Sequence, residues 1–307
     1  MKFALFEDTR VGKRPYNQDR VGHWKTGEAL LLVVADGMGG HAHGEVAAQI
    51  TVDCFGAAFR AEAKPRLADP DAFLARGVTR AHAMILHQTR KQALAQSAAD
   101  SPRTTVVACL IQQGYAYWSF IGDSRLYLIR DGRIVTRTRD HTPVQALVDS
   151  GRIREEAAMM HPDKNKLLQC LGGPRAPQVE PPARARLLKN DLLLLCSDSF
   201  WGPLTQRQLL MGLIGKPPAK ALPELVALSE TRAGPRCDNI SVLALEWLDK
   251  AVAPPVEPAT VPADAITEFK DFTATAPDFM HITDAEIDRA IEDIKKALAL
   301  KKNQERK

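Results

Sequence analysis

Two consecutive hairpin signals in the middle of the chain limit the fold more than any other feature. The segment TTVVACLIQQGYAYWSFIGD (104–123) consists of two apolar runs joined at Gln113-Gly114, and RLYLIRDGRIVTRT (125–138) repeats the pattern around Asp131-Gly132. An Asp-Gly pair between apolar runs is a strong short-range signal for a two-residue hairpin turn. Strands joined in this way pair antiparallel, so the sequence predicts an antiparallel sheet.

The helical patterns are segregated from these strands. We expect helices at roughly 44–60, 70–98, 143–150, 203–213 and 218–232. Two long helices precede the hairpins and the others follow them, whereas a doubly wound parallel sheet needs strands and helices that alternate. The order of the elements therefore favours the α+β class.

The chain of 307 residues changes character near residue 250. Residues 249–264 are rich in proline and alanine without an apolar period, which predicts an extended linker. Within the extension 265–307 we expect an amphipathic helix at about 283–302, because Thr283 and Glu286 match a capping box and isoleucines recur at helical spacing. Residues 1–248 are then one domain, and the helix either packs on that domain or docks a partner.

Composition argues against several classes of protein. Lysine and arginine number 41 against 37 acidic residues, and no basic block is interleaved with aromatics, so we expect no nucleic-acid partner. Apolar runs are too short to span a membrane, and the first residues do not resemble a signal peptide. Five scattered cysteines without CxxC spacing are typical of free, buried thiols in a reducing compartment. We expect a cytoplasmic protein that does not bind membranes.

Apolar runs in this chain repeatedly begin or end at an aspartate. Asp36, Asp123 and Asp198 end such runs, Asp238 opens one, and Asp19 lies just before a short one. Strand ends meet at the rim of a sheet, where four or five carboxylates repel one another unless a cation lies between them. Hard divalent cations with oxygen ligands, Mg²⁺ or Mn²⁺, suit such a site.

The residues that follow Asp36 support this interpretation. Gly37, Gly39 and Gly40 allow the backbone to approach closely, so that a carbonyl beside Asp36 becomes an additional possible ligand. One aspartate between two ions, with others holding each ion singly, lowers the pKa of a bound water and stabilises charge on a phosphoryl group. Arg14 precedes Asp19 by five residues, and its guanidinium suits phosphate oxygens.

Each feature alone has a simpler explanation. An aspartate followed by glycine or asparagine is usually a turn, and a lone arginine is usually a solvated surface residue. His41 and His43 suggest a zinc pair, but no third ligand stands at the spacing of a metal hydrolase. The prediction of a metal site therefore depends on the whole set of aspartates.

Taken in order, the motifs resemble the metal-dependent serine/threonine phosphatase family, known as PP2C or PPM, in its compact bacterial form. The matching segments are RPYNQD (14–19), VVADGMGGHAHGE (33–45), SFIGDSRLYLIRDG (119–132), 140–173, LLLLCSDSFWG (192–202) and CDNISVLALE (237–246). The resemblance covers residues 1–248. It implies a four-layer α-β-β-α sandwich of two antiparallel sheets flanked by helices, with a flap at about 141–172 beside the metal cleft.

The resemblance also implies roles for single residues. Asp36 would bridge two metal ions, and the Gly37 carbonyl would bind one of them. Asp198 and Asp238 would hold the other ion. Three further roles are implied: Asp123 for a third ion, Asp19 in the outer shell through waters, and Arg14 for the substrate phosphate.

The implied reaction is hydrolysis of phosphoserine or phosphothreonine in a protein, by a metal-bridging water and without a phospho-enzyme. It would need two to three Mn²⁺ or Mg²⁺ ions, and the substrate would be a phosphoprotein that a cognate serine/threonine kinase modifies. Two alternatives stay open: a pseudophosphatase that only binds phosphoproteins, and a hydrolase of small phosphate esters.

Two positions depart from the family pattern. Ser199 stands where glycine is usual, and a serine forced to positive φ would cost on the order of 1 kcal/mol. With ordinary φ its hydroxyl would instead lie near the metal waters, and we predict weakened metal affinity. Met38 occupies a position where eukaryotic members carry a histidine, so the sequence assigns no general acid.

Overall fold

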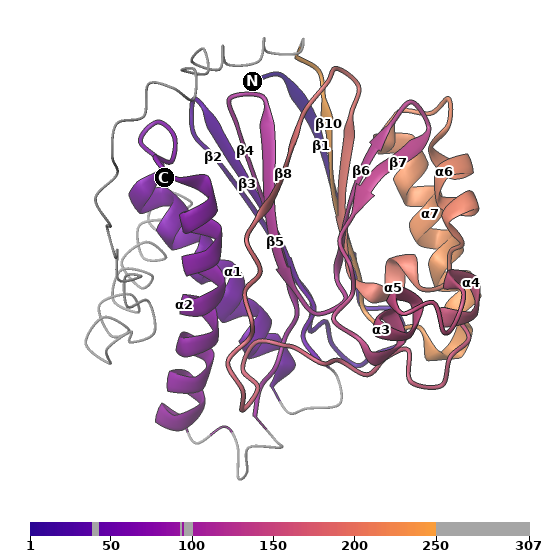
Figure 1. The fold of residues 1–307 in the computed structure, drawn as a ribbon, viewed down its shortest axis with the longest axis horizontal. Helices are drawn as coiled ribbons and strands as arrows, with labels where there is room; N and C mark the ends of the chain where they lie inside the picture. The colour runs from indigo at the N-terminus through magenta and orange to yellow at the C-terminus, as the bar shows by residue number, and fades with distance from the viewer. Residues whose placement is uncertain (39–42, 93, 95–100, 250–307) are drawn as a thin grey trace, which may run out of the picture.

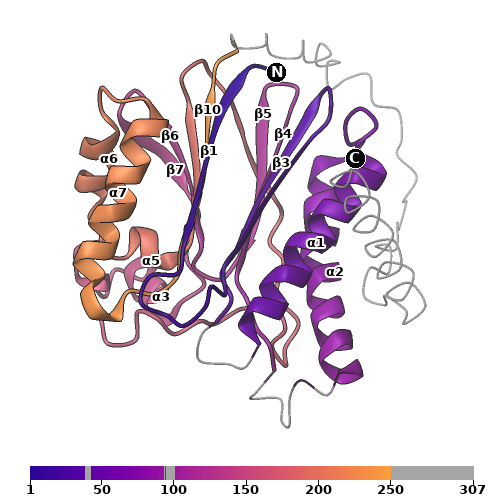
Figure 2. The ribbon, with the colours of Figure 1, turned by 180° about the vertical axis from the view of Figure 1, so that it is seen from behind.

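Two antiparallel sheets lie face to face in the computed structural model, and helices cover the outer face of each (Figure 1, Figure 2). The structure describes residues 1–38, 43–92, 94 and 101–249. The first sheet has the order β1 (Phe3–Arg10), β10 (Ile240–Trp247), β9 (Leu192–Cys196), β6 (Arg125–Arg130) and β7 (Arg133–Arg137). The second has the order β2 (Arg20–Lys25), β3 (Ala29–Ala35), β4 (Val106–Gln112), β5 (Tyr115–Ile121) and β8 (Ala183–Arg186).

The helices form the two outer layers. On the second sheet lie α1 (Gly44–Glu62) and α2 (Pro70–Lys91). On the side of the first sheet lie α5 (Asp198–Trp201), α6 (Gln206–Leu213), α7 (Pro218–Ala233) and the short 3-10 helix η2 (Gly234–Arg236). The predicted flap contains α3 (Pro143–Asp149) and α4 (Glu155–Ala158). These layers confirm the α-β-β-α sandwich expected from the sequence.

Both predicted hairpins are present. Gln113 and Gly114 have φ of 53° and 75°, and Asp131 and Gly132 have φ of 49° and 72°. Positive φ at both central residues is the feature of the type I′ turn, whose twist matches that of the flanking strands. The β4–β5 hairpin belongs to the second sheet and the β6–β7 hairpin to the first, so the chain crosses between the sheets at 122–124.

Two predicted helix boundaries are wrong. The helix expected at 70–98 ends at Lys91, because Gln92 leaves the helical conformation and the Leu94 N–H turns back to the Thr89 carbonyl at 3.1 Å. The helix expected at 203–213 begins at Gln206, because Thr205 and Gln208 form a reciprocal capping box that fixes its first turn.

The end of the sandwich brings distant parts of the sequence together. Lys2 N donates to Asp249 Oδ2 at 2.8 Å, and Leu248 N donates to the Lys2 carbonyl at 3.0 Å. Beyond Asp249, the predicted linker 249–264 and the extension 265–307 with its helix at about 283–302 lie outside the described residues. The domain boundaries therefore stay a prediction.

Strand β3 is apolar along its whole length because both of its faces are covered. Leu30, Leu32 and Val34 pack between the two sheets, whereas Leu31 and Val33 face α1 and α2. An antiparallel sheet with one wet face would alternate apolar and polar residues. Here every residue of β3 is buried, which explains the unbroken apolar run that ends just before Asp36.

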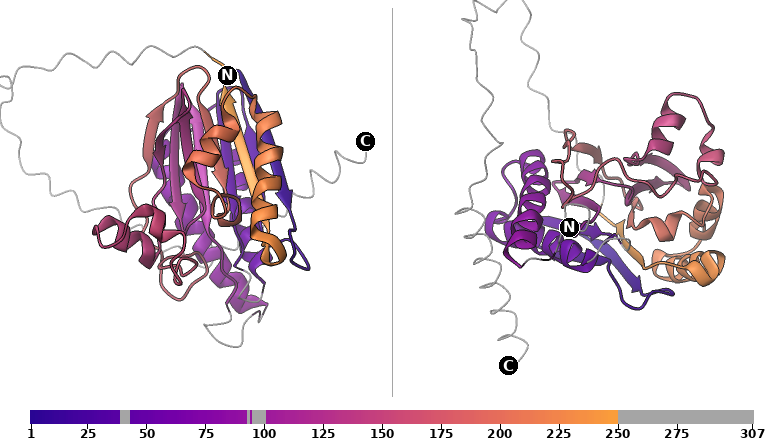
Figure 3. Two further views of the ribbon diagram at one scale, coloured as in Figure 1. Left: turned by 90° about the vertical axis from the view of Figure 1, so that its right-hand side faces the viewer. Right: turned by 90° about the horizontal axis from the view of Figure 1, so that it is seen from below.

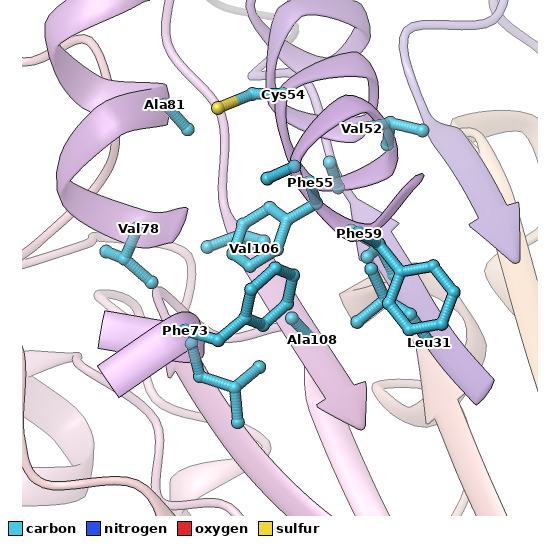
Figure 4. Close-up of a cluster of buried hydrophobic side chains, with 14 of the residues drawn as sticks. Leu31, Val52, Cys54, Phe55, Phe59, Phe73, Val78, Ala81, Val106 and Ala108 are labelled. Atoms are coloured by element: carbon cyan, nitrogen blue, oxygen red, sulfur yellow. The ribbon is translucent and has the colours of Figure 1, made fainter. Parts of the chain in front are cut away.

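Aromatic rings join the α1 and α2 layer to the second sheet (Figure 4). The Phe55 ring of α1 meets the Phe73 ring of α2 edge-on at 6.3 Å, and Phe59 lies 6.4 Å from the same ring. A Cβ atom at Gly77 would lie 2.3 Å from the Phe55 ring, so glycine permits the close approach of the two helices. Burying each such ring contributes about 1.5–3 kcal/mol to stability.

A separate apolar cluster holds the other outer layer. Phe200 of α5 and Leu222 and Val226 of α7 pack with Leu194 of β9 and Val242 of β10. Phe200 is fully buried although its helix is only four residues long. The position of α5 on the first sheet thus depends on packing rather than on helix length.

Two expectations from composition can be compared with the structure. All five cysteines are free, and four of them are buried, as predicted. Loss of hydration raises the pKa of the Cys54 thiol to about 12, so this thiol stays protonated at neutral pH. In the described ranges, each helix is too short or too polar to cross a lipid bilayer.

Candidate functional site

The five predicted aspartates come together at one end of the sandwich because of where their strands begin and end. Asp36, Asp123 and Asp198 come just after β3, β5 and β9, whereas Asp19 and Asp238 come just before β2 and β10. In an antiparallel pair, the end of one strand lies beside the start of its neighbour, as in the pairs β2–β3 and β9–β10. Carboxylates from both sheets therefore share one rim.

Burial and neighbouring carboxylates raise the pKa of Asp36 and of Asp123. Loss of hydration raises the pKa of Asp36 well above its usual value, and the charges of Asp19, Asp198, Asp123 and Asp238 raise it further, in that order. Loss of hydration followed by the charge of Asp198 likewise raises the pKa of Asp123. Carboxylates that repel one another in this way favour bound protons or cations at neutral pH.

Asp19 is the most deeply buried member of the cluster, with 3% of its surface exposed. Loss of hydration raises the pKa of Asp19 to about 7, although hydrogen bonds with Ser241 and Ser197 oppose the shift. Its Oδ2 atom is buried and has no hydrogen-bond partner among the described residues. A buried carboxylate oxygen without a partner is costly, so this atom fits a cation or a water that a cation holds.

Hydroxyl groups that the sequence analysis missed fix the backbone of Asp36. The Asp36 carbonyl accepts from Thr104 Oγ1 at 2.8 Å and from Thr105 N at 2.9 Å, and Asp36 N donates to Thr105 Oγ1 at 3.1 Å. Thr105 Oγ1 also lies 2.7 Å from Ser124 Oγ, which joins this loop to that of Asp123. The Thr-Thr pair before β4 was the available signal, but threonine is common at strand starts.

The backbone approaches closely at Gly37. A Cβ atom there would lie 2.5 Å from the Gly44 carbonyl oxygen and 2.6 Å from that of Gln18, so only glycine fits without displacement. This confirms the close approach predicted beside Asp36, whereas the ligand role of the Gly37 carbonyl stays a prediction. Gly39, Gly40 and His41 lie outside the described residues.

Arg14 lies at the edge of the cluster. Its Nη2 donates to Asp238 Oδ2 at 2.5 Å, and the side chains are 45% and 38% exposed. Asn239 anchors the loop that carries Arg14, because its amide donates to the carbonyls of Val11 and Tyr16 at 2.8 Å and 3.1 Å. By residue type Asn239 is an ordinary loop residue, but in the structure it positions this arginine beside the carboxylates.

Ser199 is unstrained. It lies inside the helical turn α5 and is not among the described residues with positive φ. The backbone strain that a positive φ would have imposed on this serine is therefore absent. Ser199 Oγ donates to Asp198 Oδ1 at 3.0 Å. Loss of hydration raises the pKa of Asp198, and this hydrogen bond opposes the rise most strongly.

Trp201 connects the two loops that carry Asp198 and Asp123. Its Nε1 donates to the Asp123 carbonyl at 3.0 Å, and its ring lies 3.3 Å from the Arg125 guanidinium. Arg125 in turn donates to both carboxylate oxygens of Asp140, at 2.8 Å and 2.7 Å. This network was not predicted from the sequence, where its available signal was an aromatic residue directly after the SDSF motif.

A cavity of about 790 Å³ opens from the carboxylate cluster. Arg14, Asp123, Asp198 and Asp238 line its inner end. The rest of its lining comes mainly from the predicted flap with α3 and α4 and from the segment 198–209; Figure 1 draws α3, α4 and α5 close together at the lower right. The cavity therefore gives a ligand larger than a phosphate ion access to the aspartates.

The cluster fits divalent cations in chemistry but is not a closed ligand cage. In the residues that the structure describes, no three His, Cys, Asp or Glu side chains are gathered around a single point. The fit is instead seen in the repulsion among the carboxylates and in the buried, unpartnered Asp19 Oδ2. Oxygen donors of this kind suit Mg²⁺ and Mn²⁺ better than softer metals.

Comparison with known proteins agrees with this geometry. A family profile described as protein phosphatase 2C matches residues 9–160. The chain is 34% identical over 225 residues to the serine/threonine protein phosphatase PstP of Mycobacterium tuberculosis, which is 72% of this chain but 41% of that protein. It is 30% identical over 246 residues to a putative protein phosphatase 2C-type of Streptococcus pyogenes, covering 79% of this chain and 96% of that protein.

Solved structures agree as well. The catalytic domain of the phosphatase PstP, crystallised with two manganese ions, superposes with a TM-score of 0.66 at 30% identity. The superposition covers 81% of this chain and 100% of that one. Sequence, fold and the arrangement of aspartates thus lead to one conclusion: the chain belongs to the protein phosphatase 2C family.

Proposed function

We propose that this protein is a metal-dependent phosphatase that hydrolyses phosphoserine and phosphothreonine in proteins, including targets of a cognate serine/threonine kinase. The observation that carries the proposal is the rim of five aspartates, where the neighbouring charges raise the pKa of Asp36 and three of the five carboxylates line a large cavity. PstP is named a serine/threonine protein phosphatase, and its catalytic domain was crystallised with two manganese ions, whereas the Streptococcus pyogenes relative is named a putative protein phosphatase 2C-type. Since the chain spans only 41% of the PstP sequence, we extend the activity to this protein as a proposal.

The aspartates divide the proposed binding roles. Asp36, whose pKa the other four charges raise, would bridge two ions, together with the Gly37 carbonyl. Asp198 and Asp238 would hold the second ion, and Asp123 would help to hold a third. Asp19 acts through water, because its free Oδ2 lies deepest in the cluster.

Bound Mn²⁺ or Mg²⁺ would supply an activated water and neutralise charge on the phosphoryl oxygens. The chain's own groups bind the phosphate and position the carboxylates. Arg14 is held at the rim by the Asn239-anchored loop, where its guanidinium can donate to two phosphate oxygens. Thr104 and Thr105 hold the Asp36 backbone, so the main chain that carries the carboxylate is fixed before an ion binds.

The test is phosphate release from a phosphothreonine peptide, with Mn²⁺ added and then chelated, for wild type and Asp198→Asn. We expect metal-dependent release in the wild type and a loss of at least about 100-fold in the variant, since it removes a charged metal ligand. Asp249→Asn, which changes a carboxylate at the far end of the sandwich, is the matched control. A folded wild type that releases no phosphate from the peptide at any metal concentration would overturn the proposal and leave the two alternatives, phosphoprotein binding and hydrolysis of small phosphate esters.

A further inference from the structure

The cavity has a basic outer part that the proposed chemistry does not use. Beyond the carboxylate rim, its lining includes Lys164 from the predicted flap, Arg207 from α6, Arg232 from α7 and Arg236 from η2. Three of these four come from one wall, formed by α6, α7 and η2. The fourth comes from 141–172, the segment on the other side of the opening.

Most other charges that line the cavity are already paired. Arg125 is paired with Asp140, Arg137 with Glu155, and Arg14 with Asp238. In the described part of the chain, by contrast, no carboxylate pairs with the exposed side chains of Arg207, Arg236 and Lys164. Among the described lining residues outside the carboxylate cluster, Glu156 is the one acidic residue that is not paired with an arginine or lysine. The outer cavity thus carries a net positive charge.

Arg232 is held in place by neutral groups rather than by an acid. Its Nη1 donates to the Pro203 carbonyl at 3.1 Å and to Gln208 Oε1 at 2.5 Å. Both bonds use the same nitrogen, so the Nε and Nη2 hydrogens keep their capacity to donate. A guanidinium held in this way loses less rotamer freedom when it binds an anion.

The basic wall is close in the chain to the proposed phosphate position. Arg236 precedes Asp238 by two residues, and Asp238 pairs with Arg14. One continuous cavity contains all of these residues, so an extended peptide whose phosphorylated residue lies at the rim would pass along this wall.

We infer that the wall formed by Arg207, Arg232 and Arg236 selects substrates with an anionic side chain near the phosphorylated residue. This inference rests on the proposed function. The anion is either an aspartate or glutamate or a second phosphorylated residue, because a guanidinium binds both through paired hydrogen bonds. The rim aspartates and Arg14 perform the reaction, and the wall adds affinity for the flanking sequence.

The test compares three phosphothreonine peptides of equal length in the presence of Mn²⁺. One has glutamines beside the phosphothreonine, one has glutamates at those positions, and one has a second phosphoserine there. The measurement is kcat/KM for each peptide at low and at high salt, for wild type, Arg207→Gln and the double variant Arg207→Gln/Arg236→Gln. The matched control is Arg133→Gln, an exposed arginine of β7 that does not line the cavity.

For the wild type we expect anionic peptides to exceed the neutral one by about tenfold at low salt, since each exposed ion pair contributes only a few-fold. The preference should shrink at high salt because these charges are solvent-screened. The double variant should bring the ratio near one, with Arg207→Gln in between, and the control should keep the wild-type ratio. Because a ratio is compared, an effect on the chemistry itself cancels.

The outcomes separate this inference from the proposed function. If the wild type hydrolyses none of the three peptides, the proposed function is overturned, and the basis of the inference is lost with it. Equal hydrolysis of all three by the wild type overturns the inference alone, and so does a preference that survives in the double variant. A preference for glutamate and phosphoserine alike supports a general anion subsite, whereas preference for phosphoserine alone supports one for doubly phosphorylated segments.

Discussion

The two outer layers of the sandwich differ in what they do for the molecule. On the second sheet, α1 and α2 have 19 and 22 residues and cover a continuous apolar cluster. On the first sheet, α7 has 16 residues but α5 and α6 have only four and eight, and the cavity with its charged lining opens beside these two short helices. Figure 3 shows the longer α1–α2 pair apart from the short helices beside the flap. None of the described lining residues belongs to α1 or α2. One layer closes the core, and the other combines packing with the placement of Asp198.

The strongest test of this difference between the two layers is to truncate one buried aromatic ring in each. Phe55 and Phe200 are both fully buried, so Phe55→Ala and Phe200→Ala should each lower the free energy of unfolding by about 3–5 kcal/mol. Only Phe200→Ala should also weaken metal binding and so raise the Mn²⁺ concentration that activity requires, because Phe200 shares one helical turn with Asp198. The measurements are urea unfolding and the Mn²⁺ concentration at half-maximal phosphate release.

The comparison fails if the folded fraction of Phe55→Ala shows the same shift in Mn²⁺ requirement as Phe200→Ala. In that case the long-helix layer would also position the aspartates. Measuring both variants under conditions where each is fully folded keeps stability apart from metal affinity.

A smaller effect is expected for Trp201→Phe. The change removes the Nε1 donor to the Asp123 carbonyl and keeps an aromatic ring over Arg125. Losing one such hydrogen bond costs about 1 kcal/mol, which corresponds to about a fivefold higher Mn²⁺ requirement. The control is Trp247→Phe, since the Trp247 indole nitrogen is buried without a partner in the described residues and lies far from the rim. If Trp247→Phe raises the Mn²⁺ requirement equally, the Trp201 hydrogen bond does not position Asp123.

The smallest effect concerns Ser199. Because Ser199 Oγ donates to Asp198 Oδ1, Ser199→Ala should free that oxygen and lower the Mn²⁺ requirement by about two- to threefold. Ser199→Gly removes the same hydroxyl but also costs about 1 kcal/mol in a helical turn, so alanine is the cleaner change. A Mn²⁺ titration of Ser199→Ala that superimposes on that of the wild type would contradict the prediction.

The sequence predicts the hairpins but not how they are distributed between the sheets. Asp131-Gly132 and Gln113-Gly114 specify their turns locally, through positive φ at adjacent residues. In contrast, the pairing of β6 with β9 and of β1 with β10 joins segments far apart in the chain. Such pairing depends on which apolar faces are buried together, and no short motif carries that information. The layered arrangement was therefore reached through the resemblance to a family.

The site was predictable where a residue type is unusual for its position. An aspartate at the end of a buried apolar run is costly without a partner, and this made Asp36 and Asp198 visible. Thr105, Asn239 and Trp201 support the site equally directly, but their residue types are ordinary at strand starts, in loops and in short helices. Their roles depend on long-range neighbours, which only the fold supplies.

The hydrogen bonds that join Lys2 to Leu248 and Asp249 have a consequence for how the chain can be rearranged. Since β1 and β10 are adjacent strands, residues 2 and 249 meet at the end of the sandwich opposite the aspartates. The turn at Gln113-Gly114 lies at that same end. A circular permutant that joins 249 to 2 and opens at this turn would keep every strand in its present sheet and leave the rim intact, because tolerance to a cut depends on the contacts that it breaks.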